Sequence, residues 1–174
     1  MQDQGRTISK NWKHWLSQLG LKTCQDCRTM HGKIYPMRKL LIKRPPLHLF
    51  CHCKIKPMEA IVAGRATRNG TSGADYWIKY YHTLPNQYIT KAEARKKGWI
   101  AKNGNLNSVL PGKVIGGDIF RNDDGHLPDA PGRVWYEADI DYISGYRGIG
   151  RLLFSNDGLI FVSYDHYQTY MEVT

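Results

Sequence analysis

Helical spacing of apolar residues marks the stretch that begins at residue 74. ADYWIKYYHTL carries its aromatic residues as a short amphipathic helix would, and the proline that follows ends it. Thr90 and Glu93 have the spacing of a capping box, which predicts a second helix at about 91–97. Asn105, after a glycine, offers the cap of a third and very short helix.

Beyond Pro111 the apolar residues recur at every second position, which is typical of strands with one buried face. The segments are VIGGDIF, RVWYEADIDYI, RLLFSNDGLIFVSYD and HYQTYMEV. Ser155–Gly158 lies between two apolar runs and predicts a hairpin turn. Short helices followed by strands with short turns predict an α+β fold with an antiparallel sheet.

Residues 1–62 follow neither pattern and form a small basic, cysteine-bearing segment. Trp12 and Trp15 stand at helical spacing, which favours one apolar face over a platform for stacking bases. Residues 63–73, AGRATRNGTSG, are rich in residues that resist packing, and no apolar period crosses them. We therefore predict a linker at 63–73 and a second domain at 74–174.

Composition narrows the class of protein. With 174 residues, of which 41% are hydrophobic and 23% charged, the chain is too short for a large multidomain enzyme and is expected to fold. No stretch approaches the roughly 18 apolar residues of a membrane span, and the first residues lack the apolar core of a signal peptide. We expect a soluble chain, located in the cytoplasm of the producing cell or delivered by a carrier.

The net charge of +10 is unevenly distributed. The first 70 residues hold 14 Lys and Arg against 3 Asp and Glu, whereas the remaining 104 residues are nearly balanced. Such an excess is either a solvated face or a surface that attracts polyanions through counterion release. Weak, salt-sensitive RNA binding is the functional alternative.

All four cysteines lie in this basic segment. Cys24 and Cys27 are separated by two residues, and Cys51 and Cys53 by one. Two pairs of thiolates suit a tetrahedral zinc ion, which would stabilise a segment too small to bury much apolar surface. His48 and His52 offer alternative nitrogen ligands. Two disulfides or four free thiols are the other interpretations.

These cysteines carry a first resemblance. TCQDCRTMHGKIYP and PPLHLFCHC resemble the C-terminal end of phage minor head, or head morphogenesis, proteins. Leu49 and His52 depart from that family's usual residues. The resemblance implies that the first segment is the tail of a phage-head-like carrier to which the second domain is attached.

Few side chains of the second domain are candidates for chemistry, and each of them alone has an ordinary structural explanation. Together they make a constellation: one carboxylate (Glu137), one imidazole (His166) and three cations (Lys91, Arg147 and Arg151). A base, an acid and cations that hold phosphoryl oxygens are what transesterification of an RNA phosphodiester requires. The sequence has no cluster of carboxylates suited to two magnesium ions, which agrees with chemistry independent of metal.

A second resemblance covers residues 74–171, which are similar to the barnase family of bacterial guanyl-preferring ribonucleases. The segments that carry it are LPNQYITKAEARKKGWIA, GNLNSVLPGKVIGGDIF, GRVWYEADIDYISGYR and DHYQTY. The resemblance implies that Glu137 is the general base, that His166 is the general acid, and that the three cations bind phosphate. It also implies a guanine-reading loop and substrate-binding residues, namely Phe120, Arg121, Asn122, Asp123, Asp124 and Tyr167.

The chain departs from that family at several positions. Asp123 stands where the family has arginine, and Asp124 where it has glutamate, which makes guanine preference less certain than cleavage. Gly158 replaces a tryptophan that packs on the histidine corresponding to His82. An acidic, barstar-like inhibitor is the partner that the family implies.

The predicted protein is an endoribonuclease that cleaves single-stranded RNA to a 2′,3′-cyclic phosphate, without a catalytic cofactor and with structural zinc as an option. We expect a delivered toxin domain. The alternative is a catalytically silent RNA-binding or capsid-associated module, but binding alone would not need both Glu137 and His166.

Overall fold

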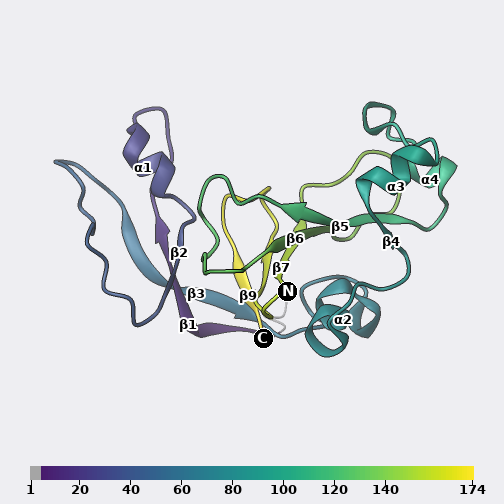
Figure 1. Cartoon of the computed structure of the whole chain (residues 1–174). Coiled ribbons are helices and arrows are strands. Elements are labelled where there is room, and N and C mark those ends of the chain that lie inside the picture. Colours follow the sequence, from purple (N-terminus) through teal and green to yellow (C-terminus); the bar gives the residue numbers. More distant parts are fainter. Residues whose placement is uncertain (1–4) are drawn as a thin grey trace.

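A nine-stranded mixed sheet runs through the whole molecule (Figure 1). The structure is a computed structural model that describes residues 5–174. The strand order is β2-β1-β3-β9-β8-β7-β6-β5-β4. The strands are β1 (Arg6–Leu16), β2 (Ile34–Pro36), β3 (Lys54–Ile61), β4 (Tyr88–Ile89), β5 (Val114–Phe120), β6 (Trp135–Asp139), β7 (Arg151–Ser155), β8 (Ile160–Ser163) and β9 (Met171–Val173).

The α+β prediction is confirmed, but the sheet is not purely antiparallel. Strands β5 to β9 pair antiparallel in chain order, as the alternating pattern and short turns predict. At the two ends of this central part, β4 pairs with β5 in parallel and β3 pairs with β9 in parallel. Both parallel pairs join strands that are far apart along the chain, so no local turn signal could show them.

Short helices lie at both ends of the sheet, α1 near β2 and α3 and α4 near β4, and α2 lies beside the sheet (Figure 1). They are α1 (Gln25–Met30), α2 (Ala74–Tyr81), α3 (Lys91–Lys96) and α4 (Leu106–Val109), with single 3₁₀ turns η1 (Gly70–Ser72) and η2 (Ala101–Asn103). The predicted capping box is present at α3: Thr90 Oγ1 accepts from Glu93 N, and the Glu93 carboxylate accepts from Thr90 N. The three helices predicted after residue 74 are confirmed.

The tryptophans of the first segment do not lie on a helix. They belong to β1, in which the register shifts between Ile8 and Lys13. Trp12 packs edge-on against Phe161 of the central sheet, with ring centroids 5.6 Å apart. Trp15 is fully buried in a separate cluster with the cysteines. Helical spacing is therefore the wrong interpretation, because residues three apart on a strand face opposite sides of the sheet, which places Trp12 and Trp15 in two different cores.

Residues 63–73 are packed rather than loose. Asp75 is fully buried at the start of α2, and its carboxylate accepts hydrogen bonds from Gly64 N (2.7 Å), Ala66 N (2.9 Å) and Thr67 Oγ1 (2.9 Å). A buried carboxylate with these partners holds the segment against the helix. The expectation that 63–73 resists packing is not met, while the division into domains stays a prediction.

Two cores cover the two faces of the sheet. On one face, Leu152 and Val162 pack with Ile78 of α2. On the other face, Leu153 and Phe161 pack with Met58 of β3. The first segment thus shares a core with the central strands. No helix within residues 5–174 is both long enough and apolar enough to cross a membrane.

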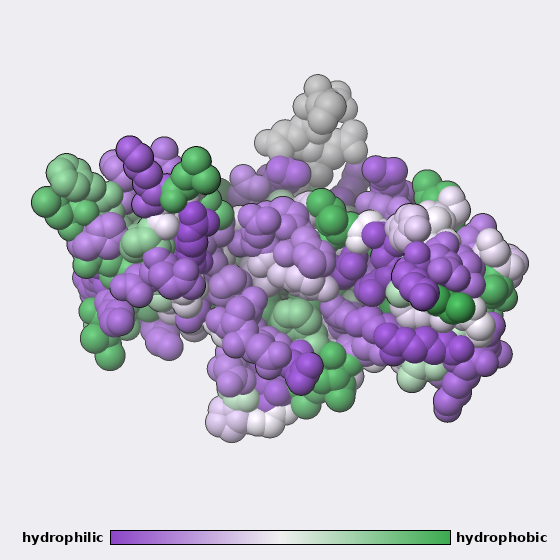
Figure 2. Space-filling model, turned by 90° about the horizontal axis from the view of Figure 1, so that it is seen from above, coloured by the Kyte–Doolittle hydropathy of each residue, from purple (hydrophilic) through white to green (hydrophobic). Residues whose placement is uncertain are grey.

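The loops of the first segment extend away from the sheet and form a lobe of their own (Figures 1 and 2). Hydrophobic residues lie on its surface between hydrophilic ones, and Leu21, Ile42 and Phe50 are among the most exposed large apolar side chains. The core of this lobe is small and consists mainly of Trp15 and the cysteines. It therefore needs a further source of stability.

Candidate active site

Glu137 is a buried carboxylate in the middle of β6, on the face of the sheet opposite α2. Lys91, the first residue of α3, makes an ion pair with Glu137 through its Nζ atom. Its backbone N–H donates to the Asp118 carboxylate at 3.0 Å, which holds the start of the helix against β5. The hydroxyl of Tyr167 donates to Glu137 Oε2 at 2.5 Å.

The two partners determine the charge state of Glu137. Burial raises the pKa of its carboxyl group, but the hydrogen bonds from Lys91 and Tyr167 and the charge of Arg147 outweigh that effect. The net result is a lowered pKa, so the carboxylate is ionised at neutral pH. An ionised carboxylate is the form that can accept a proton.

Asp139, which sequence analysis did not single out, anchors two of the predicted cations. It lies two residues after Glu137 on the same face of β6 and is 2% exposed. Its carboxylate accepts from Arg147 Nε (2.6 Å) and Nη2 (2.7 Å), and Arg151 Nε lies 3.2 Å from Oδ1. The strand period that places Glu137 on this face also places Asp139 there, and that was the available signal.

Arg151 is also held by backbone carbonyls. Its Nη1 atom donates to the carbonyl oxygens of Gly148 (2.6 Å) and Gly150 (2.7 Å). Burial of this guanidinium fixes its direction. The predicted phosphate-binding cations thus lie around Glu137 on three separate elements: α3, the loop after β6, and β7.

The loop between β8 and β9 carries His166 and Tyr167, both with left-handed backbone conformations (φ 56° and 69°). Asp165 organises this loop. Its carboxylate accepts from Ser163 Oγ (2.9 Å), Thr169 Oγ1 (2.5 Å) and Thr169 N (2.9 Å). Such a network can keep non-glycine residues in a conformation that otherwise costs energy.

His166 lies exposed at the tip of this loop. Its ring is next to that of Tyr167, with centroids 4.8 Å apart, and Tyr167 in turn contacts Glu137. The structure therefore brings the predicted base and acid together through Tyr167. No direct contact between Glu137 and His166 is present in the described chain.

A pocket of about 470 Å³ opens beside Glu137. It is lined by Lys91, Glu137, Tyr167, Ile119 and the predicted base-reading loop of residues 120–124. Phe120 stacks on Tyr167 with ring centroids 5.2 Å apart. The predicted substrate-binding residues thus share one cavity with Lys91 and Glu137, whereas His166, Arg147 and Arg151 lie outside its lining.

Asn122 determines the shape of the base-reading loop. Its backbone is left-handed (φ 52°), and its side chain makes two hydrogen bonds of 3.0 Å with the backbone of Leu127, donating through Nδ2 and accepting through Oδ1. The side chain of Asn122 therefore holds the loop closed, while the residue itself lines the pocket.

The two acidic residues of the loop have different partners. Asp124 accepts from His126 N at 3.0 Å, and its Oδ2 lies 3.3 Å from His126 Nδ1. Asp123 forms an exposed ion pair of 3.7 Å with Arg121. The additional negative charge at Asp123 thus has a neighbouring cation in the same loop.

His82 ends α2 in a left-handed conformation (φ 56°), and its backbone N–H donates to the Ile78 carbonyl. It lines a hollow of about 570 Å³ together with Gly158 of the β7–β8 hairpin. A side chain built on Gly158 would meet nothing within 4 Å. A tryptophan in place of Gly158 would reach His82 across this hollow, and this chain lacks that contact.

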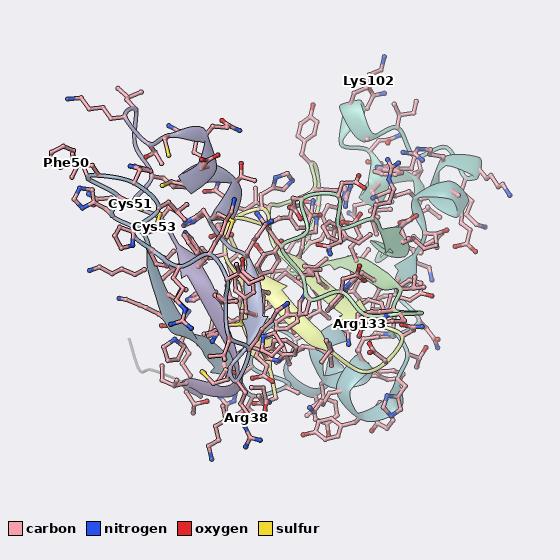
Figure 3. All side chains as sticks on the ribbon, turned by 60° about the vertical axis from the view of Figure 1, so that its left-hand side comes forward. Arg38, Phe50, Cys51, Cys53, Lys102 and Arg133 are labelled. Atoms are coloured by element: carbon pink, nitrogen blue, oxygen red, sulfur yellow. The ribbon has the colours of Figure 1, made fainter. Side chains whose placement is uncertain are left out.

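The first segment holds a second cluster of reactive side chains. Two groups of three donor atoms, each within 4.8 Å of one another, share Cys27: one with Cys24 and His48, the other with Cys51 and Cys53. The four cysteines form no disulfide within residues 5–174. Figure 3 shows Cys51 and Cys53 next to each other just before β3. These groups can hold a metal ion, and His52 belongs to neither of them.

Comparison with known proteins identifies the second part of the chain. The ribonuclease family matches residues 72–174. A ribonuclease of Heyndrickxia coagulans is 53% identical over 100 residues, which are 58% of this chain and 91% of that protein. Ribonucleases of Bacillus intermedius and Bacillus pumilus are also 53% identical over 100 residues, which cover 61% of each.

The match leaves the first segment outside. It begins at residue 72, so the resemblance of residues 23–53 to phage head proteins receives no support from it. That resemblance stays a prediction from the sequence.

Proposed function

This chain belongs to the barnase family of microbial ribonucleases, and from that premise we propose that it cleaves single-stranded RNA by transesterification to a 2′,3′-cyclic phosphate. Ribonucleases of this family need no catalytic cofactor. The observation that carries the proposal is the ionised, buried Glu137, which lies in one pocket with Lys91, Tyr167 and the base-reading loop.

In the proposed reaction Glu137 is the general base. Its carboxylate takes the proton of the ribose 2′-hydroxyl, and the 2′-oxygen attacks phosphorus. The bond to the 5′-oxygen breaks, and this oxygen takes a proton from the imidazolium of His166. Exposure of His166 at a loop tip suits an acid that must reach a leaving group at the edge of the pocket.

The cations stabilise the additional negative charge on the phosphoryl oxygens. Lys91 lies directly on Glu137, while Arg147 and Arg151 are directed by the Asp139 carboxylate. Positioning by a buried carboxylate reduces the reorganisation that the arginines undergo when the phosphate arrives. Asp139 is thus a positioning residue in this proposal.

Guanine preference is proposed on the loop of residues 120–124. The Asp124 carboxylate can accept two hydrogen bonds from the guanine edge once it leaves His126. Phe120 and Tyr167 offer a stacked aromatic pair at the pocket wall. Asn122 contributes by holding the loop, as its bonds to Leu127 support.

A single-stranded RNA of known sequence, incubated with the purified full chain in excess EDTA, tests the reaction. We expect fragments that end in 2′,3′-cyclic phosphate. A parallel reaction in magnesium-free buffer without chelator retains any metal at the cysteines. RNA that stays intact in both reactions but binds the protein would identify the silent RNA-binding module instead and overturn the proposal.

The biological setting is a separate proposal. We propose that the chain is a delivered toxin and that a barstar-like acidic protein inhibits it. The resemblance to the family implies such an inhibitor, and the basic character of this chain would favour binding of an acidic partner. Co-expression with a candidate acidic inhibitor should abolish cleavage and restore growth of the host. Growth arrest that persists despite a stable complex would argue against such a partner.

A further inference from the structure

The turn of residues 31–34, where the chain passes from α1 into β2, lies against both loops of the proposed active site. We propose that this turn positions the base-reading loop through His126 and the loop of His166 through Gln168, a role that rests on the proposed function. The turn belongs to the first segment, outside the residues that the ribonuclease family matches. The first segment thus takes part in base selection and in proton transfer.

The contact with the base-reading loop runs through two neighbouring residues. Ile34 N–H donates to the His126 carbonyl at 2.8 Å, and His126 N–H donates to the Asp124 carboxylate at 3.0 Å. Ile34 also packs in one core with Leu127, whose backbone makes both hydrogen bonds of the Asn122 side chain. The loop of residues 121–134, green in Figure 1, lies beside the segment that leads from α1 into β2. The turn therefore holds the end of the base-reading loop.

The contact with the loop of His166 is made by backbone atoms. A Cβ built on Gly32 would lie 2.3 Å from the Gln168 carbonyl oxygen, and Gly32 has a φ of +85°. Both the close approach and the positive φ therefore require glycine at this position. Gln168 directly follows Tyr167, and its N–H donates to the Asp165 carboxylate that organises the loop. A displacement of Gln168 would thus reach Tyr167 and His166.

Strand β1 holds the turn from its other side. Gly32 N donates to the Trp15 carbonyl at 2.9 Å, and Trp15 N donates to the Lys33 carbonyl at the same distance. His31 Nδ1 accepts from Ser17 N at 3.0 Å. Trp15 itself is fully buried. A turn fixed in this way determines where the two loops on its other side lie.

Strand β1 is in turn fixed to the sheet that carries the site. The buried carboxylate of Glu172, on β9, accepts from Ser9 Oγ at 2.6 Å and from Asn11 Nδ2 at 2.8 Å. The neighbouring strand β3 pairs with β9 at Ala60 and Ile61. The support of the two loops is therefore continuous with the central sheet.

Positioning and a general contribution to folding predict different measurements. A contact that only stabilises the fold changes the amount of active enzyme, which lowers the rates on all substrates by the same factor. A contact that positions the base-reading loop changes the ratio of rates on two bases. A contact that positions the proposed acid changes the ratio of rates on two leaving groups.

Gly32→Ala tests base selection. The Gln168 carbonyl would have to move by about 1 Å to make an ordinary contact with the new methyl group, and a displacement of this size can cost up to about 10² in rate. We expect the ratio of guanine to adenine cleavage, measured on two dinucleotides that differ in the 5′ base, to fall by about tenfold. Gly112→Ala is the control, because Gly112 has a similar positive φ but meets nothing within 4 Å.

The same variant tests proton transfer. In a guanosine 3′-phosphate ester of nitrophenol, the leaving group departs without a proton from His166, whereas the 5′-oxygen of a dinucleotide needs one. We expect Gly32→Ala to lose about tenfold more activity on the guanine dinucleotide than on the nitrophenyl ester. Gly112→Ala should lose the same factor on both substrates.

His31 provides a second variant that adds no atoms to the turn. His31→Ala removes the acceptor of Ser17 N and should change both ratios in the same direction as Gly32→Ala. His31→Asn, whose Oδ1 atom can accept in place of Nδ1, should restore them. A loss that His31→Asn does not restore would overturn the role of the contact with Ser17.

The outcomes separate this role from the proposed function. Wild type that cleaves neither substrate overturns the proposed function and the role of the turn with it. Wild type that cleaves both, with unchanged ratios in Gly32→Ala and His31→Ala, overturns only the role of the turn. Equal changes in Gly112→Ala would assign the effect to backbone strain and overturn it as well. Wild type without guanine preference overturns the part in base selection, while the ratio of leaving groups still decides the part in proton transfer.

Discussion

The hydroxyl of Tyr167 donates a hydrogen bond of 2.5 Å to Glu137 Oε2, which joins the loop of the proposed acid to the strand of the proposed base. The loop itself is held by Asp165, and the strand by its neighbours β5 and β7. The bond lies between groups that are 30 residues apart in the sequence. The pocket beside Glu137 therefore depends on how the loop between β8 and β9 packs against strand β6.

Removal of either proposed catalytic group should slow cleavage strongly. We expect Glu137→Gln and His166→Ala each to reduce kcat/KM on single-stranded RNA by about 10² or more, because a general base or acid contributes at least that factor. Thermal unfolding would verify that each variant folds. Wild-type rates in a folded variant would exclude that residue from the mechanism.

The pH dependence should report the environment of Glu137. Lys91 and Tyr167 lower its pKa, so the acidic limb of kcat/KM should lie below the usual range of a glutamate. Lys91→Ala removes the ion pair while burial remains, which raises the pKa and moves this limb to higher pH. Lys96→Ala, on the same helix and exposed, is the control. If the acidic limb of Lys91→Ala stays at the wild-type pH, Lys91 does not lower the pKa of Glu137.

Base preference should follow the two acidic residues of the recognition loop. Asp124→Ala should flatten the preference for guanine, because no other carboxylate is proposed to face its edge. Asp123→Arg should raise turnover on RNA, although Arg121 already offsets part of the charge at Asp123. Initial rates on four dinucleotides that differ in the 5′ base measure both effects. Equal rates in wild type would refute guanine reading.

Asp75 should be essential to the stability of the segment at 63–73. Asp75→Asn leaves buried donors without their charged acceptor and should lower the free energy of unfolding by about 3 kcal/mol. Asp129→Asn, at an exposed position, should change little. Chemical denaturation measures both. An effect below 1 kcal/mol for Asp75→Asn would mean that residues 63–73 rearrange and satisfy these donors at little cost in stability.

The basic lobe should add affinity for RNA only at low salt. Exchange of the exposed Lys22, Lys39 and Lys43 for glutamine should reduce the slope of log K against log salt by up to about 2, since each phosphate contact on a single strand contributes about 0.7. A 2′-O-methyl RNA, which lacks the attacking hydroxyl, allows binding to be measured without cleavage. Lys96, Lys97 and Lys102 provide a matched triple exchange. An unchanged slope would mean that these three lysines are solvated and do not contact RNA phosphates.

The sequence alone was sufficient where neighbouring residues determine structure. The capping box at Thr90, the hairpin at Ser155–Gly158 and the alternating strands all follow from contacts within a few residues. The resemblance to a ribonuclease family, since confirmed over residues 72–174, named the candidate site residues before their geometry was known.

Only the tertiary structure could show how the first segment relates to the enzyme. Nothing in the spacing of β3 indicates that it pairs with β9 more than 100 residues later, or that Gly32 lies against the loop of His166. Likewise, the pattern of cysteines could not show that His48 comes close to Cys24 and Cys27. Such a cluster exists only after segments distant in the sequence have come together.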